Sequence, residues 1–155
     1  MIVSGGPRNT PPGTITRLFF GALAHDKPDA LQVKVKGQYT PISSRTVGER
    51  VRRLALGLQE MEIQPGERVA IFSENRPEWA IADYACLTAS LTDVPLYPNL
   101  PPEQAAYILN DSGAVAIFVS DAAQAAKIAE VRGKCSTLRH VITFSPASHA
   151  GADLT

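Results

Sequence analysis

The pattern of apolar and polar residues divides the chain into an irregular N-terminal part and a regular remainder. Residues 16–24 (TRLFFGALA) predict a short helix. The segment LQVKVKGQYTP, residues 31–41, alternates apolar and polar positions around Lys36-Gly37 and predicts a small β-hairpin with one face in solvent.

From Thr46 the period becomes helical. The apolar residues now share one stripe of an amphipathic helix, formed by Val47, Val51, Leu54, Ala55, Leu58 and Met61. At the start of this helix, Thr46 and Glu49 are expected to form a capping box.

From residue 68 onward, short apolar runs alternate with helical segments. Strands are predicted over residues 68–72, 93–96, 115–119 and 138–144, and helices over 76–89, 102–110 and 122–131. Because the strands are continuous apolar runs, they should be buried on both faces, which indicates a parallel sheet covered by helices on each side. The expected fold class is therefore α/β, with three layers and a mostly parallel sheet preceded by the hairpin.

Composition suggests one domain between two irregular ends. Residues 1–14 are rich in glycine, proline and small polar residues and are expected to form a flexible tail. Residues 15–145 are expected to form a single α/β domain, and the small polar residues 146–155 a linker or truncated end.

Charge and cysteine content exclude several classes of protein. Fifteen Lys and Arg balance fifteen Asp and Glu, so no basic field would attract nucleic acid. No run of eighteen apolar residues predicts a membrane span. Cys86 and Cys135 are isolated from each other and from any histidine at metal spacing, which favours a reduced, cytoplasmic location and no metal site.

The corners that follow the first three strands of this repeat contain no phosphate-binding motif. They read SENRP (73–77), YPNLPP (97–102) and SD (120–121). Neither G-x-G-x-x-G nor G-x-x-x-x-G-K-[ST] occurs in the chain, so no glycine-rich loop is available to close on phosphate.

The SENRP corner allows two interpretations. In the first, Asn75 is the N-cap of the following helix, Pro77 lies in its first turn, Glu78 favours its positive end and Trp79 anchors it on the sheet. In the second, Asn75 or Arg76 contacts a substrate, because ligands of open α/β sheets bind at the carboxyl ends of the strands. Asn75 and Arg76 are thus the candidate substrate-binding residues, and the first interpretation is favoured.

Other candidate residues have simpler explanations. Cys86 lies among alanines on a helix and is expected in the core instead of acting as a nucleophile. The arginines at positions 45, 50, 52 and 53 fit a solvated helix face better than an anion site. His25, His140 and His149 have no catalytic partner nearby in sequence, so no catalytic residue is assigned.

Two segments carry a resemblance to a known family. GERVAIFSENRPEWAIADYACL, followed by VPLYPNLPPEQAAYILNDSGA, resembles the N-terminal part of AMP-forming acyl-CoA synthetases of the adenylate-forming superfamily. The sequences of these two segments are most similar to those of long-chain fatty acid CoA ligases. The resemblance extends from about residue 31 to residue 144.

The resemblance implies an N-terminal subdomain of the adenylate-forming fold and a two-step reaction in the parent protein. A fatty acid would react with Mg-ATP to give an acyl adenylate, and CoA would then displace AMP. The family's Ser/Thr/Gly-rich phosphate loop ending in P-K-G, its aromatic-Gly-x-Thr-Glu motif, its ribose-binding Asp and its C-terminal lysine have no counterpart in these residues. ATP, magnesium and CoA are therefore implied for the parent, which could also lie peripherally at a membrane, whereas this chain alone is expected to be an inactive scaffold that binds none of them tightly.

Two expectations remain open at this point. One alternative to the ligase is a free-standing flavodoxin-like binding or interaction module, which the genomic reading frame beyond Thr155 would distinguish. In addition, the helix predicted over residues 76–89 is apolar nearly all round, and the chain is expected to cover only about two of its sides. The chain is therefore expected to self-associate through this helix or through a sheet edge.

Overall fold

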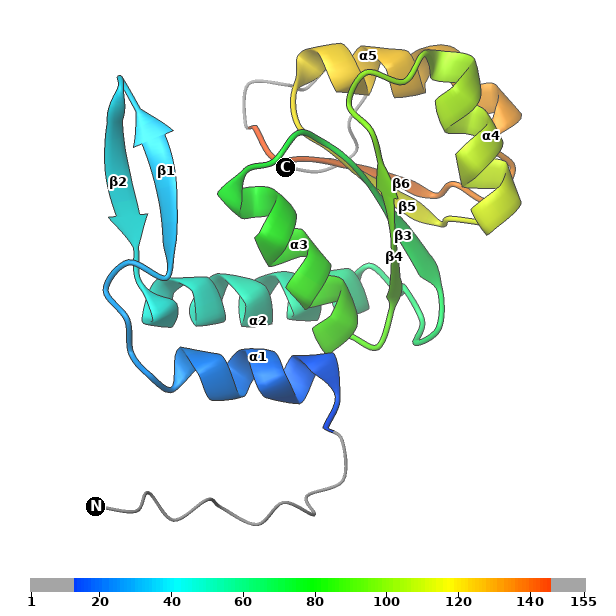
Figure 1. Cartoon of the computed structure of the whole chain (residues 1–155). Helices are drawn as coiled ribbons and strands as arrows, with labels where there is room; N and C mark the ends of the chain where they lie inside the picture. The colour runs from blue at the N-terminus through cyan, green and yellow to red at the C-terminus, as the bar shows by residue number, and fades with distance from the viewer. Residues whose placement is uncertain (1–12, 146–155) are drawn as a thin grey trace, which may run out of the picture.

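The computed structural model describes residues 13–145, which form one four-stranded parallel sheet with helices on both faces (Figure 1). The predictions for residues 1–12 and 146–155 lie outside the described residues. In the sheet the strand order is β4-β3-β5-β6, with β3 at Arg68–Phe72, β4 at Thr92–Leu96, β5 at Ala116–Val119 and β6 at His140–Thr143. The predicted parallel, three-layer α/β fold is confirmed.

Successive residues of β3 point into two separate hydrophobic cores. Val69 and Ile71 face the core formed with α2 (Ser44–Glu60) and α3 (Pro77–Thr88). Ala70 and Phe72 face the core formed with α4 (Pro102–Ser112) and α5 (Ala122–Val131). A short 3-10 helix, η1 (Arg132–Lys134), follows α5. A strand buried on both faces in this way explains why its sequence is a continuous apolar run.

The N-terminal part adds a helix and a hairpin beside the sheet. Helix α1 (Ile15–Leu23) begins after Thr14, whose side chain accepts a hydrogen bond from the backbone N–H of Arg17 at 3.2 Å. Strands β1 (Leu31–Val35) and β2 (Gln38–Ile42) pair antiparallel. The φ angles of Lys36 and Gly37 are +49° and +85°, as a tight two-residue hairpin turn requires. The predicted hairpin is confirmed, and Thr14 belongs to the helix start instead of the tail.

Helix α3 is covered over most of its surface within the described chain. No residue from Pro77 to Ala89 is exposed, because α3 packs against α1, α2, β1, β3 and β4. Tyr84 stacks on Phe19 of α1 with 3.8 Å between the ring centroids. The expectation that only about two sides of this helix are covered is therefore wrong, since the N-terminal helix and hairpin supply the missing cover.

Two predicted helix caps are also wrong. The N-cap of α2 is Ser43, whose side chain accepts a hydrogen bond from the N–H of Thr46 at 3.2 Å, so the Thr46–Glu49 capping box does not form. The N-cap of α3 is Arg76, in extended conformation and without a side-chain cap hydrogen bond, so Asn75 is not the cap. The reason is Pro77, which lies in the first turn as predicted and sterically confines the residue before it to extended backbone.

Candidate functional site

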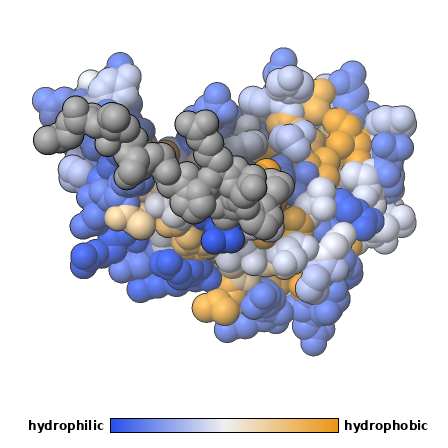
Figure 2. Space-filling model, turned by 60° about the horizontal axis from the view of Figure 1, so that its bottom comes forward, coloured by the Kyte–Doolittle hydropathy of each residue, from blue (hydrophilic) through white to orange (hydrophobic). Residues whose placement is uncertain are grey.

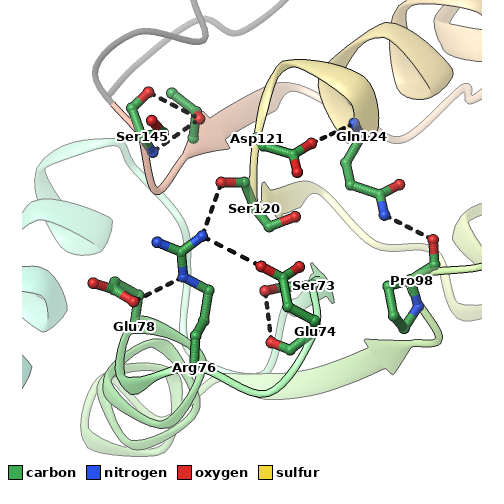
Figure 3. A network of polar contacts seen from close by, with 10 residues as sticks. Ser73, Glu74, Arg76, Glu78, Pro98, Ser120, Asp121, Gln124 and Ser145 are labelled. Carbon is green, nitrogen blue, oxygen red and sulfur yellow. Dashed lines mark hydrogen bonds and ion pairs between the residues drawn. The ribbon is translucent and has the colours of Figure 1, made fainter. Parts of the chain in front are cut away.

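The carboxyl ends of β3 and β5 meet at the point where the chain reverses its direction across the sheet. From β3 the chain passes through α3 to β4 on one side, whereas β5 lies on the other side and leads through α5 to β6. Such reversal points are the usual ligand sites of open α/β sheets. Here the corner after β3 and the corner after β5 lie close together, as Figure 3 shows.

Arg76 occupies the space between these two corners. Its Nη1 donates a hydrogen bond to the backbone oxygen of Ser120 at 3.2 Å, and its Nε donates to Glu78 Oε2 at 2.8 Å. Nη1 also lies 3.5 Å from Glu74 Oε1. The guanidinium carbon lies 5.7 Å from the centroid of the Phe144 ring. With these contacts, the side chain of Arg76 joins the corner after β3 to the corner after β5.

The ion pair changes the acidity of Glu78. Burial alone would raise the pKa of Glu78, but the hydrogen bond from Arg76 and the charges of Arg76 and Arg50 outweigh burial and hold the pKa below its usual value. Glu78 is therefore a carboxylate partner of Arg76 and not a group that exchanges protons near neutral pH.

The corner after β4 is fastened to α5. Gln124 donates a hydrogen bond from Nε2 to the backbone oxygen of Pro98 at 2.7 Å, and Lys127 donates from Nζ to the same oxygen at 3.1 Å. Asp121 caps α5 by accepting a hydrogen bond from the N–H of Gln124 at 2.9 Å. Two buried polar atoms in this region, Ser120 Oγ and Gln124 Oε1, have no hydrogen-bond partner within residues 13–145.

A hollow of about 540 Å³ lies between the corners after β3 and β4. Asn75 and Trp79 line it on the β3 side, and Tyr97 and Pro98 line it on the β4 side. Tyr97 is 78% exposed, and the amide of Asn75 forms no hydrogen bond with a described residue. Ser73 and Glu74 also line it. The hollow thus offers aromatic and proline surfaces, one free amide and the side chain of Glu74, which suit a planar or apolar group that also carries a hydrogen-bond donor.

The two predicted site residues lie together but make different contacts. Asn75 and Arg76 both line a hollow beside β1, but only Asn75 also lines the hollow between the corners after β3 and β4. Arg76 directs its guanidinium group into the polar network (Figure 3). Sequence reasoning missed that Tyr97 and Trp79 share the hollow with Asn75. Tyr97 directly follows β4, and this position was a usable signal, because neighbouring parallel strands end at the same edge of a sheet. Trp79 lies in the first turn of α3, beyond the corner after β3.

The remaining candidates are not part of a reactive site. Cys86 is fully buried, and burial, with the charges of Asp93 and Asp83, raises the pKa of its thiol to about 12. Burial also raises the pKa of the free Cys135 thiol. The four arginines predicted on a solvated face, at positions 45, 50, 52 and 53, are all exposed. Within the described residues no group of three or more His, Cys, Asp or Glu side chains could hold a metal ion.

His25 and His140 lie apart from this hollow. His25 lines a separate hollow beside α1, and His140 begins β6. His149 lies outside the described residues.

Comparison with known sequences gives a consistent picture. The model of the family described as AMP-binding enzyme matches residues 20–153. The long-chain-fatty-acid–CoA ligase FadD15 of Mycobacterium tuberculosis is 37% identical over 122 residues, which cover 77% of this chain and 20% of the relative. Long-chain-fatty-acid–CoA ligase 6 of Mus musculus is 33% identical over 121 residues, which cover 76% of this chain and 17% of that relative. The chain thus spans about a fifth of the length of the curated relatives it matches.

Solved structures with the same fold include a CoA ligase and an acetoacetyl-CoA synthetase. The anthranilate CoA ligase AuaEII in complex with anthranoyl-AMP superposes with a TM-score of 0.73 and 18% identity, over 83% of this chain and 24% of the other. Acetoacetyl-CoA synthetase from Streptomyces lividans gives a TM-score of 0.71 and 21% identity, over 83% of this chain and 21% of the other. At these identities the likeness establishes the shared fold.

Proposed function

The chain belongs to the family of AMP-binding enzymes, and we propose that it is the N-terminal part of a long-chain fatty acid CoA ligase. The whole protein would convert a fatty acid, ATP and CoA into acyl-CoA, AMP and pyrophosphate. The observation that carries this proposal is the 37% identity with FadD15, which extends over 77% of this chain. No observation supports the alternative of a free-standing flavodoxin-like module.

Within such a ligase, these residues serve as a scaffold. Their two proline-stiffened corners contain no glycine-rich loop, and Arg76 already fills the reversal point of the sheet. ATP and magnesium would therefore be held by parts of the ligase beyond this chain, since phosphoryl chemistry needs fixed donors and a metal. The unpartnered Ser120 Oγ and Gln124 Oε1 support contact between this edge of the sheet and further protein, because buried polar atoms are normally hydrogen-bonded.

We assign different roles to the two candidate site residues. Asn75 is proposed to contact substrate, because its amide is exposed beside the hollow and is free to form a hydrogen bond. Arg76 is proposed to hold the corner in place, because its hydrogen bonds and ion pairs go to Ser120, Glu74 and Glu78.

The location and the association of the protein are proposals of the same kind. We propose a cytoplasmic protein, because both cysteines are free thiols. Self-association of the isolated chain is proposed to use an edge of the sheet, since β4 and β6 are edge strands within the described residues. A monomer mass by light scattering at tens of micromolar would contradict self-association.

The ligase proposal is tested by activity and by the reading frame. We expect the gene to continue past Thr155 into a Ser/Thr/Gly-rich loop ending in P-K-G, and the full-length protein to release pyrophosphate from ATP in the presence of palmitate and CoA. The 155-residue chain should release no more pyrophosphate than an enzyme-free blank. Activity of the isolated chain would refute its role as a scaffold, and a full-length protein that activates no fatty acid would refute the ligase.

A further inference from the structure

Exposed apolar side chains occur at several places on this molecule and do not by themselves mark a site. The face shown in Figure 2 has separate hydrophobic patches among hydrophilic side chains. No helix of residues 13–145 is long and apolar enough to cross a membrane. Tyr97, which is 78% exposed, lines the hollow between the corners after β3 and β4, and here a second feature is present, because the backbone that follows Tyr97 is held by α5.

The corner after β4 begins with a β-turn. The backbone N–H of Leu100 donates a hydrogen bond to the backbone oxygen of Tyr97 at 3.1 Å, and Pro98 occupies the second position of the turn, where its fixed φ is favourable. The turn uses the backbone oxygen of Tyr97 and leaves those of Pro98 and Leu100 for other partners. The path of this corner therefore depends on what binds these two oxygens.

Two side chains of α5 bind both oxygens. Gln124 donates a hydrogen bond from Nε2 to the backbone oxygen of Pro98 at 2.7 Å, and Lys127 donates from Nζ to the same oxygen at 3.1 Å. Lys127 Nζ also donates to the backbone oxygen of Leu100 at 3.2 Å. The same ammonium group lies 5.3 Å from the centroid of the ring of Phe72, the last residue of β3. Because hydrogen bonds from charged donors are stronger than neutral ones, Lys127 supplies the larger part of this attachment.

The opposite wall of the hollow is held by the same end of α5. Arg76, which follows Asn75, donates from Nη1 to the backbone oxygen of Ser120 at 3.2 Å, directly before the N-cap of α5 (Figure 3). Neither Ser120 nor Gln124 nor Lys127 lines the hollow. The start of α5 therefore fixes both walls of the hollow without being part of it.

We propose that Gln124 and Lys127 are positioning residues, which set the distance between Tyr97 and Trp79 across the hollow and thereby the affinity of the hollow for substrate. This inference rests on the proposed contact of Asn75 with a substrate in the same hollow. A wall that is ordered beforehand loses little conformational freedom when a ligand binds, so the attachment to α5 favours binding.

The orientation of Gln124 supports this assignment. Gln124 is 7% exposed, and its Oε1 has no hydrogen-bond partner within residues 13–145. Its amide therefore serves the backbone oxygen of Pro98 while its own oxygen stays unpaired. Such an arrangement indicates that the contact with the corner determines where this side chain lies.

The fluorescence of Trp79 reports on the hollow, because the 155-residue chain has a single tryptophan. The double variant Gln124→Leu/Lys127→Met removes all three donated hydrogen bonds. Quenching of Trp79 by acrylamide should become about twofold more efficient in this variant, since the corner opens locally. Lys134→Met is the matched control, because Lys134 is exposed and pairs with Glu103 of α4, and its quenching should equal that of the unmodified chain.

Single variants keep the test decisive if the double variant is unstable. Lys127→Met and Gln124→Leu each leave one donor on the backbone oxygen of Pro98, so both should stay folded by circular dichroism and show a smaller rise in quenching. Lys127→Arg keeps a charged donor and should be quenched as the unmodified chain is. In Lys127→Met the amide of Leu100 should exchange its hydrogen faster, whereas the amides of β5 should exchange as before.

In the full-length ligase, steady-state kinetics separate a positioning role from a general structural one. Asn75→Ala identifies the substrate in the hollow as the one whose KM it raises, among fatty acid, ATP and CoA. Lys127→Met should raise the same KM about tenfold and change kcat by less than about twofold. In a Tyr97→Ala background, Lys127→Met should have little further effect, because both substitutions act on the same contact.

Three results would overturn the proposal. They are unchanged quenching of Trp79 in the double variant, faster hydrogen exchange throughout the sheet in Lys127→Met, and an effect of Lys127→Met on KM that adds in full to that of Tyr97→Ala. Failure of the ligase proposal gives a different result, namely a full-length protein that activates no fatty acid. In that case quenching and hydrogen exchange in the 155-residue chain still decide whether α5 holds the corner.

Discussion

Replacing Asp83 by asparagine should stabilise the protein at neutral pH. Asp83 lies on α3, and Asp93 lies on the edge strand β4 in register with Val69, so its side chain is on the face of the sheet that α3 covers. The carboxyl group of Asp93 is close enough for its charge to act on Asp83. Burial, followed by the charge of Asp93 and the hydrogen bond with it, raises the pKa of Asp83 from its ordinary value of 3.8 to about 6.

The size and the pH dependence of the effect follow from this pKa. A rise from 3.8 to about 6 corresponds to about 3 kcal/mol at full effect, but Asp83 is partly exposed, so screening by solvent reduces this to about 1 kcal/mol. The folded state binds the proton more tightly than the unfolded state. Stability is therefore lost as the pH rises from about 4 to about 6, and the full penalty applies above pH 6. The asparagine side chain of the variant would donate an amide hydrogen to Asp93 at any pH and avoid the penalty.

Urea unfolding at two pH values measures this effect. At pH 7.5 we expect Asp83→Asn to unfold with a free energy about 1 kcal/mol higher than the unmodified chain, equivalent to about 3 °C in melting temperature. At pH 4.5 most of this gain should disappear. Asp111→Asn, on the exposed side of α4, should show no such pH-dependent gain. A variant of Asp83 that is no more stable at pH 7.5, or whose gain is the same at both pH values, would refute the proposed carboxyl pair.

Three further changes test other parts of the structure. Arg76→Gln should destabilise the protein by about 1–2 kcal/mol, because it removes the charged hydrogen bonds between two corners, whereas Arg53→Gln on the exposed face of α2 should have little effect in the same urea titration. Ser43→Ala should lower the free energy of unfolding by about 1 kcal/mol, because Ser43 caps α2, whereas Asn75→Ala should lower it by less than about 0.5 kcal/mol. A larger loss for Asn75→Ala than for Ser43→Ala would show that Asn75 does cap α3. Cys86 should resist alkylation by iodoacetamide at pH 8 in the folded chain, because its thiol is buried with a pKa of about 12, and rapid labelling without unfolding would contradict this burial.

The elements themselves could be predicted from sequence because each has a strong local pattern. The helix predicted over 122–131 and the strand predicted over 68–72 have the bounds that the structure shows, at Ala122–Val131 and Arg68–Phe72. The last strand is shorter than the predicted 138–144, since only His140–Thr143 pairs with β5. The error at the start of α2 arose because Ser43 and Thr46 both belong to the residue types that cap helices. Which of them is the cap depends on where the extended backbone gives way to the helix.

The site depended on information that local patterns do not contain. Arg76 reaches the backbone of Ser120 because β5 lies beside β3 in the sheet. An alternation of strands and helices in the sequence does not determine which strands become neighbours. The cover of α3 by Phe19 likewise depends on how α1 folds back across it. The restriction that Pro77 imposes on Arg76 was in contrast available from the sequence and would have given the correct cap.

The central place of β3 has a consequence for how the chain folds as it is synthesised. β3 pairs with β4, which is made soon after it, and with β5, which is made only after β4 and α4. A nascent chain that ends before Ala116 would hold only the parallel pair β3–β4, and two strands are too few for a stable sheet. One whole edge of Val69 to Phe72 would meanwhile lie open, next to an apolar α3. We therefore expect such ribosome-bound chains to be sensitive to proteases and to be bound by chaperones, and the change to a resistant domain to occur abruptly once Val119 has left the ribosome.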